Sequence, residues 1–303
     1  MNQLIEEWLS DGPLLIDGGW GTELQKLGLP VGQPPELWNQ SEPRKVERVA
    51  ASYIAAGSDI ILTNTFGANP FLLARHNAED WFEELNRLGV EISCRAASAA
   101  PRRVLVFASI GPTGLLPMMA GPEMIDRLSE AFEKQAAAQA AGGANALVVE
   151  TMSDPIEAAT AVRAAKKTGL PVVACMTFGS GKKKDRTMMG TTPETAADLL
   201  LDAGADVLGS NCGQGIEGFL PICQRLRAVT DRPLWMKGNA GLPKMVDGQS
   251  VYDQTPEGFA DAAMKLLDEG VMFLGGCCGT TPAYIDELRR RMKKDRSSGT
   301  QES

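Results

Sequence analysis

Histidine is almost absent from this sequence, since His76 is the single one among 303 residues. Mechanisms in which a histidine activates a serine or cysteine nucleophile therefore lack their usual base. His76 follows Arg75 in a segment of helical character, where we expect it to pack or to face solvent. Long apolar runs are also missing. No segment approaches the about 18 uninterrupted apolar residues of a membrane span, so we expect no membrane partner.

Positive charge is in the minority, with 30 Lys and Arg against 38 Asp and Glu and a net charge of −8. Because no basic stripe is present, we expect no nucleic-acid partner. The first 13 residues lack the basic and then apolar pattern of a secretory signal. Six cysteines are too few for a disulfide framework in a chain of this length. We therefore expect a cytoplasmic protein, in which clustered cysteines indicate metal binding or catalysis.

Short apolar runs alternate with longer amphipathic stretches such as 123–141 and 256–269. Such alternation predicts β-α units, and eight of them fit a parallel (β/α)8 TIM barrel better than an open doubly wound sheet. We predict this α/β barrel over residues 1–290 and a disordered polar tail over 291–303. The eight expected strands are 14–17, 60–63, 105–110, 146–150, 172–177, 207–211, 234–238 and 273–276.

Unusual residues follow almost every expected strand, at the barrel rim where catalytic groups of such folds lie. Asp17 ends the first strand and precedes a glycine loop. Its carboxylate suits either a structural turn cap or a ligand contact. Glu150 closes the apolar run 146–149. Because a buried glutamate needs a partner, we predict that Glu150 contacts a ligand.

Three cysteines follow the sixth and eighth expected strands, namely Cys212, Cys277 and Cys278. Only one strand separates these two, so the three thiols can converge on one ion. A Cys277–Cys278 disulfide would leave Cys212 unused, and a closed structural zinc site normally has four protein ligands. Three thiolates at a cleft instead predict a catalytic Zn²⁺ whose open position takes a sulfur substrate and keeps it nucleophilic. The other three cysteines are expected in the core.

The assembled motifs resemble those of the homocysteine S-methyltransferase family. They are Asp17-Gly18-Gly19, residues 63–69, Glu150-Thr151, Asn211-Cys212 and residues 275–282. The resemblance covers most of the chain. It implies a (β/α)8 barrel, zinc held by the three matched cysteines, and transfer of a methyl group to homocysteine, giving methionine.

The same resemblance assigns further residues to the substrate. It implies that Glu150 and Asp17 meet the amino group of homocysteine, and that backbone amides around Gly18 and Gly19 lie near its carboxylate. Asn239 stands in a Gly-Asn-Ala-Gly stretch similar to the homocysteine module of cobalamin-dependent methionine synthases. There the asparagine oxygen can occupy zinc when substrate is absent, which is our hypothesis for Asn239.

Residues 35–39, 186–190 and 237–244 are most similar to bacterial betaine–homocysteine methyltransferases. This similarity implies betaine or a related onium compound as the methyl donor. An onium donor needs only in-line attack by the thiolate, because its leaving group departs neutral. Delivery of the methyl group by a separate corrinoid protein is the alternative.

Aromatic residues that hold betaine in the animal enzymes are missing here. Those enzymes place a tyrosine where this chain has Thr151 and a tryptophan where it has residues 33–34. Trp20, Trp38 and Phe66 can form a different cage for a quaternary ammonium group.

Two functions of other classes remain open. Lys237 ends the seventh expected strand and can serve as the Schiff-base lysine of an aldolase-like barrel. A non-catalytic sensor of zinc or homocysteine is the other alternative.

Overall fold

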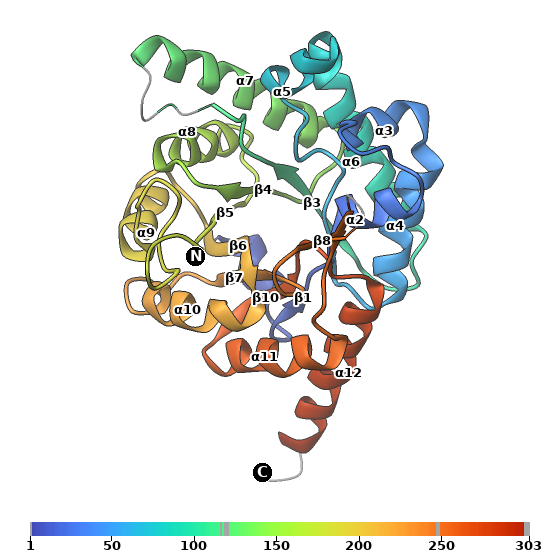
Figure 1. Cartoon of the computed structure of the whole chain (residues 1–303), viewed down its shortest axis with the longest axis vertical. Coiled ribbons are helices and arrows are strands. Elements are labelled where there is room, and N and C mark those ends of the chain that lie inside the picture. The colour runs from blue at the N-terminus through green and yellow to red at the C-terminus, as the bar shows by residue number, and fades with distance from the viewer. Residues whose placement is uncertain (1, 116, 118–120, 247–248, 300–303) are drawn as a thin grey trace.

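Eight parallel strands form the centre of the molecule. The computed structural model describes residues 2–115, 117, 121–246 and 249–299. The strand order is β1-β10-β7-β6-β5-β4-β3-β2, and a parallel bridge between Ile16 and Ile60 joins the two ends of the sheet. Figure 1 shows the ring of strands surrounded by helices, which confirms the predicted (β/α)8 barrel. The strands are β1 (Leu14–Leu15), β2 (Ile60–Ile61), β3 (Leu105–Ile110), β4 (Ala146–Met152), β5 (Val172–Met176), β6 (Val207–Gly215), β7 (Leu234–Asn239) and β10 (Val271–Gly276).

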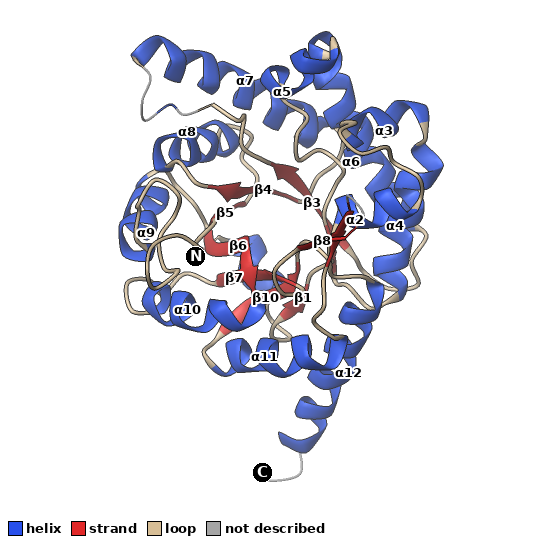
Figure 2. Ribbon diagram, in the orientation of Figure 1, coloured by secondary structure: helices blue, strands red, loops and turns tan. Residues whose placement is uncertain are grey.

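Helices cover the outside of this barrel (Figure 2). Several start where a capping side chain precedes a proline: Asp154, Thr192 and Thr255 each accept a hydrogen bond from a backbone N–H of the following turn. No described helix is both long and apolar enough to cross a membrane. The α-helices are α1 (Gln3–Trp8), α2 (Trp20–Lys26), α3 (Trp38–Ser41), α4 (Pro43–Ala55), α5 (Pro70–Leu73), α6 (Phe82–Ser98), α7 (Pro122–Ala141), α8 (Pro155–Lys166), α9 (Pro193–Asp202), α10 (Phe219–Arg227), α11 (Pro256–Asp268) and α12 (Pro282–Gly299).

The barrel interior changes from apolar to polar along the strands. Phe107 and Trp235 stack with their ring centroids 5.9 Å apart, and Trp8 of α1 packs on Phe107 at 5.3 Å. Alternate residues of a strand point to the same face. Ser109 lies two residues after Phe107 on β3, and Lys237 lies two residues after Trp235 on β7, so both also face the interior. The polar layer lies at the carboxyl ends of the strands, where the site is built.

Two segments differ from the sequence prediction. β8 (Lys244–Val246) and β9 (Gln249–Val251) form an antiparallel hairpin after β7 that was not predicted. Helix α12 runs through residues 291–299, where we predicted a disordered tail. Arg290 and Arg291 both pair with Glu287 one turn earlier, and such pairs support a continuing helix. The last part of the predicted tail, 300–303, lies outside the described residues.

Candidate metal centre and active site

Three thiols meet at the carboxyl ends of β6 and β10. The Sγ atoms of Cys212, Cys277 and Cys278 all lie within 4.8 Å of one another. No other group of three His, Cys, Asp or Glu side chains in the described ranges could hold a metal ion in this way. The structure thus brings together the three cysteines that the sequence singled out. The other cysteines lie elsewhere: Cys175 and Cys223 are buried, as expected, and Cys94 is half-buried.

A tight turn allows adjacent cysteines to point toward the same place. Cys277 still continues the strand, because its N–H donates to the Gly238 carbonyl at 2.8 Å. The chain then turns, with Thr280 donating to the Cys277 carbonyl from both its N–H and its hydroxyl. Gly279 adopts a φ of +80°, which side chains other than glycine rarely allow. This turn takes Cys278 out of the strand and beside its neighbour.

The pKa values of the three thiols are shifted in different directions. Hydrogen bonds from Cys277 and Cys278 lower the pKa of the Cys212 thiol. The pKa of Cys277 is raised, mainly because its proton is bound to Cys212 and because the thiol is buried. Ionising all three sulfurs at this spacing brings three like charges together and therefore requires a compensating cation. A soft divalent metal such as Zn²⁺ fits a donor set of this kind.

Two asparagines surround the thiols. Asn239 donates from Nδ2 to the Cys212 sulfur at 3.8 Å, and its Oδ1 accepts from the Cys278 N–H at 3.1 Å. Asn211 donates to the Cys277 sulfur at 3.9 Å and to a Glu150 oxygen at 3.3 Å. Asn211 thus links the sulfur cluster to the carboxylate. The sequence indicates Asn211 only as part of the Asn211-Cys212 motif, because its position next to Cys212 carries no signal of its own.

A buried ion pair forms the floor of the site. Lys237 Nζ lies 2.8 Å from Asp17 Oδ1, and the two side chains are 2% and 0% exposed. The other Asp17 oxygen accepts from Trp20 Nε1 at 2.7 Å and from the Leu62 N–H at 2.6 Å. Burial works against the charge on Lys237, but attraction to Asp17 and Glu150 outweighs it and raises the lysine's pKa. Asp17 is thus fully engaged by protein donors.

Glu150 is the second carboxylate of the floor. Its Oε1 accepts from the Ser109 hydroxyl at 2.5 Å, and burial raises its pKa in spite of the attraction of Lys237. The floor therefore combines one positive and two negative groups. In their ionised forms they leave one negative charge, which suits a cationic group of a ligand.

The glycine loop after β1 lies against the cysteine turn. A side chain at Gly18 would come within 2.8 Å of the Thr280 carbonyl, and one at Gly19 within 2.7 Å of the Cys277 carbonyl. Tyr53 ties both segments together, because its hydroxyl bonds the Gly19 and Thr280 carbonyls. Glycine is thus required here by close approach of two backbones.

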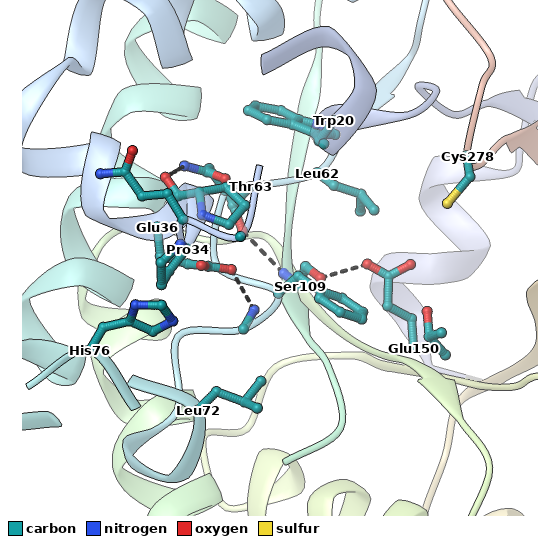
Figure 3. Close-up of a pocket in the computed structure, with 18 of the residues that line it drawn as sticks. Trp20, Pro34, Glu36, Leu62, Thr63, Leu72, His76, Ser109, Glu150 and Cys278 are labelled. Carbon is teal, nitrogen blue, oxygen red and sulfur yellow. Dashed lines mark hydrogen bonds between the residues drawn. The ribbon is translucent and has the colours of Figure 1, made fainter. Parts of the chain in front are cut away.

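A cavity of about 480 Å³ opens beside the thiols. Figure 3 shows Glu150 and Cys278 on one side of it and His76 and Leu72 on the other. Its walls are mainly apolar and include the rings of Trp20 and Phe66.

The structure revises two predictions, one for Trp38 and one for His76. Trp38 is buried in the core, where Lys45 lies over its ring at 4.5 Å. The expectation that it joins Trp20 and Phe66 in a cage is therefore wrong. His76 is exposed as expected, but it also lines the cavity.

Comparison with known proteins places these features in a family. A family model described as homocysteine S-methyltransferase matches residues 14–292. The methionine synthases of Mycobacterium tuberculosis and Mycobacterium leprae are 30% and 29% identical over 92% and 93% of this chain. The chain spans 24% of the length of these relatives.

Solved structures support the same fold. The metallated form of the homocysteine methyltransferase MmuM from Escherichia coli superposes with a TM-score of 0.78 and 24% identity, covering 94% of this chain and 99% of that chain. The family match extends over most of the chain and confirms the family resemblance that the motifs carried. The chain belongs to the homocysteine S-methyltransferase family.

Proposed function

We propose that the protein transfers a methyl group to the thiol of homocysteine and releases methionine. The observation that carries this proposal is the convergence of three thiols at the edge of a cavity that also contains Glu150. In this cavity, the amino group of a thiol substrate can reach Glu150, and its sulfur can reach a metal ion held by the three thiols.

Zinc is the cofactor that we propose for Cys212, Cys277 and Cys278. Tetrahedral zinc with Zn–S bonds of about 2.3 Å separates its sulfur ligands by roughly 3.8 Å. The observed spacing of the sulfurs, within 4.8 Å, fits such an ion. When bound, zinc supplies a positive centre that lowers the pKa of the substrate thiol.

The floor of the site orients the amino acid part of the substrate. We propose that Glu150 binds the ammonium group, because Glu150 lines the cavity and the floor has an excess negative charge. Asp17 was expected to meet the same ammonium group, but its two oxygens accept from Lys237, Trp20 and Leu62, so we propose instead that it holds Lys237 and Trp20 in place. Backbone amides around Gly18 are proposed to lie near the substrate carboxylate, whereas the Gly19 N–H already donates to the Thr280 carbonyl at 2.9 Å.

Asn239 is proposed to supply an oxygen to zinc when homocysteine is absent. Its side chain already contacts Cys212 and Cys278. The test is the Asn239→Ala variant, zinc-loaded without substrate and studied by X-ray absorption. We expect loss of one oxygen or nitrogen ligand, and an unchanged zinc environment contradicts this role.

The methyl donor is proposed to be betaine or a related onium compound. Apolar walls with Trp20 and Phe66 suit a methylated cation. In-line attack by the homocysteine sulfur forms the new S–CH3 bond while the donor's N–CH3 or S–CH3 bond breaks. Because its leaving group departs neutral, no general acid is needed.

A separate corrinoid protein is the second candidate donor. It is favoured by the identity to two methionine synthases about four times as long as the matched segment. An aldolase function through Lys237 is disfavoured, because this lysine is buried and ion-paired, and the pairing raises its pKa.

The deciding experiment measures methionine. The zinc-loaded protein and homocysteine are incubated separately with betaine, S-methylmethionine, dimethylsulfoniopropionate and methylcobalamin. Methionine formation with at least one donor supports the proposal. Binding of homocysteine without methionine from any donor contradicts it and points to a sensor.

A further inference from the structure

A second buried carboxylate faces the cavity, and the chemistry above does not use it. Glu36, in the 3-10 turn η1 (Pro35–Leu37), is 2% exposed and lines the cavity. Its Oε1 accepts a hydrogen bond from the Gly67 N–H at 2.6 Å. Its own backbone N–H also stabilises the carboxylate, and the described residues place no cation within ion-pair distance of it.

A buried carboxylate without a cation partner is costly, because backbone hydrogen bonds replace only part of the hydration that it loses. Burial accordingly raises the pKa of Glu36. The cost falls when a cation enters the cavity and contacts the carboxylate. Phe66, which directly precedes Gly67, also lines the cavity, so the cavity offers a cation an aromatic ring as well as this carboxylate.

Glu36 lies in a different part of the cavity from Glu150 and Cys278, which are proposed to serve homocysteine. Figure 3 shows Glu36 and His76 on one side and Glu150 and Cys278 on the other. Arg75 lines the cavity as well, and the described residues provide no ion-pair partner for its guanidinium. A negative group and a free positive group therefore both line this cavity, apart from the thiols.

We propose that Glu36 binds the onium centre of the methyl donor and that Arg75 binds its carboxylate. The substrate class is a zwitterionic onium carboxylate, such as betaine or dimethylsulfoniopropionate. This inference rests on the proposed methyl transfer. Glu36 then adds a negative charge to the aromatic rings of Trp20 and Phe66 in binding the cation.

The charges of the donor and of Glu36 determine which kinetic constant of the donor changes. The onium centre loses its positive charge as the methyl group leaves, so attraction to Glu36 is stronger in the bound ground state than in the transition state. Removing the negative charge of Glu36 must therefore change mainly the KM for the donor and kcat much less.

The test uses Glu36→Gln, which keeps an oxygen for the Gly67 N–H and removes the charge. We expect KM for betaine or dimethylsulfoniopropionate to rise at least about tenfold, with kcat changed by less than about threefold. The homocysteine Kd, measured by calorimetry, stays unchanged. The matched control is Glu79→Gln, an exposed glutamate that is not among the described cavity residues.

Arg75→Gln tests the other half of the site. We expect a rise in KM for donors that carry a carboxylate and no rise for trimethylsulfonium, which has none. An unchanged donor KM in Glu36→Gln overturns the inference, as does an equal rise in the homocysteine Kd, which indicates a scaffolding role.

Donor choice separates this inference from the proposed function. Wild-type protein that uses methylcobalamin and no onium donor overturns the inference and leaves methyl transfer to homocysteine intact. Wild-type protein that forms no methionine with any donor contradicts the methyl transfer itself.

Discussion

Replacing Lys237 by methionine is expected to destabilise the fold strongly. Methionine retains an apolar stem but removes the ammonium group that lies 2.8 Å from Asp17. Both side chains are buried, so the change leaves Asp17 and Glu150 without their cation. Removing one partner of a buried ion pair costs about 3–5 kcal/mol. We expect a loss of this size in the free energy of unfolding, measured by urea denaturation followed by circular dichroism.

The double variant Asp17→Asn, Lys237→Met isolates the pair. It removes both charges, so we expect it to be more stable than the sum of the single losses predicts, with a coupling energy of roughly 2–3 kcal/mol. The control is Lys167→Met, whose ion pair with Glu133 lies at the surface and contributes at most about 1 kcal/mol. A Lys237→Met variant no less stable than the control, or a coupling energy near zero, would show that the buried Asp17–Lys237 pair does not stabilise the fold as predicted.

Three further predictions concern the metal, the substrate and the surface. Cys212→Ser is expected to lower zinc affinity at least about 100-fold in a chelator competition, whereas Cys94→Ser retains wild-type affinity; equal affinities contradict the assignment. Glu150→Gln is expected to raise the homocysteine Kd about tenfold in calorimetry, and an unchanged Kd argues against the ammonium contact. Hydrogen bonds from Arg225 lower the pKa of Glu194 to about 2, so this pair stabilises the fold above the usual carboxylate pKa and loses its effect as pH falls toward 2. Because Glu194 is 38% exposed, we expect Glu194→Gln to cost about 1 kcal/mol at pH 7 and less at pH 3 in urea denaturation; an equal loss at both values contradicts this sign.

The sequence predicted the barrel because each strand is a short apolar run bounded by glycine, proline or polar residues. The same pattern located the three cysteines, since strand ends fix which residues share a rim. The hairpin after β7 was missed because its two strands have three residues each. Helix α12 was cut short in the prediction, because charge and polarity alone do not distinguish a solvated helix from a disordered tail.

Side-chain partners at the site were harder to predict. The pairing of Asp17 with Lys237 joins residues 220 positions apart, and it depends on which strands face each other across the barrel interior. Trp38 illustrates the opposite error, since its aromatic ring suggested a ligand cage and proved to belong to the core. Glu36 stood out only as part of the motif at 35–39, and no role was predicted for it, because its burial depends on the loop at Gly67.

We propose that the homocysteine sulfur joins the three cysteine sulfurs on one zinc ion. X-ray absorption at the zinc edge tests it most directly, with the zinc-loaded protein measured before and after addition of homocysteine. We expect three sulfur ligands without substrate and four with it. Three sulfurs in both states, at homocysteine concentrations that saturate binding, would contradict it.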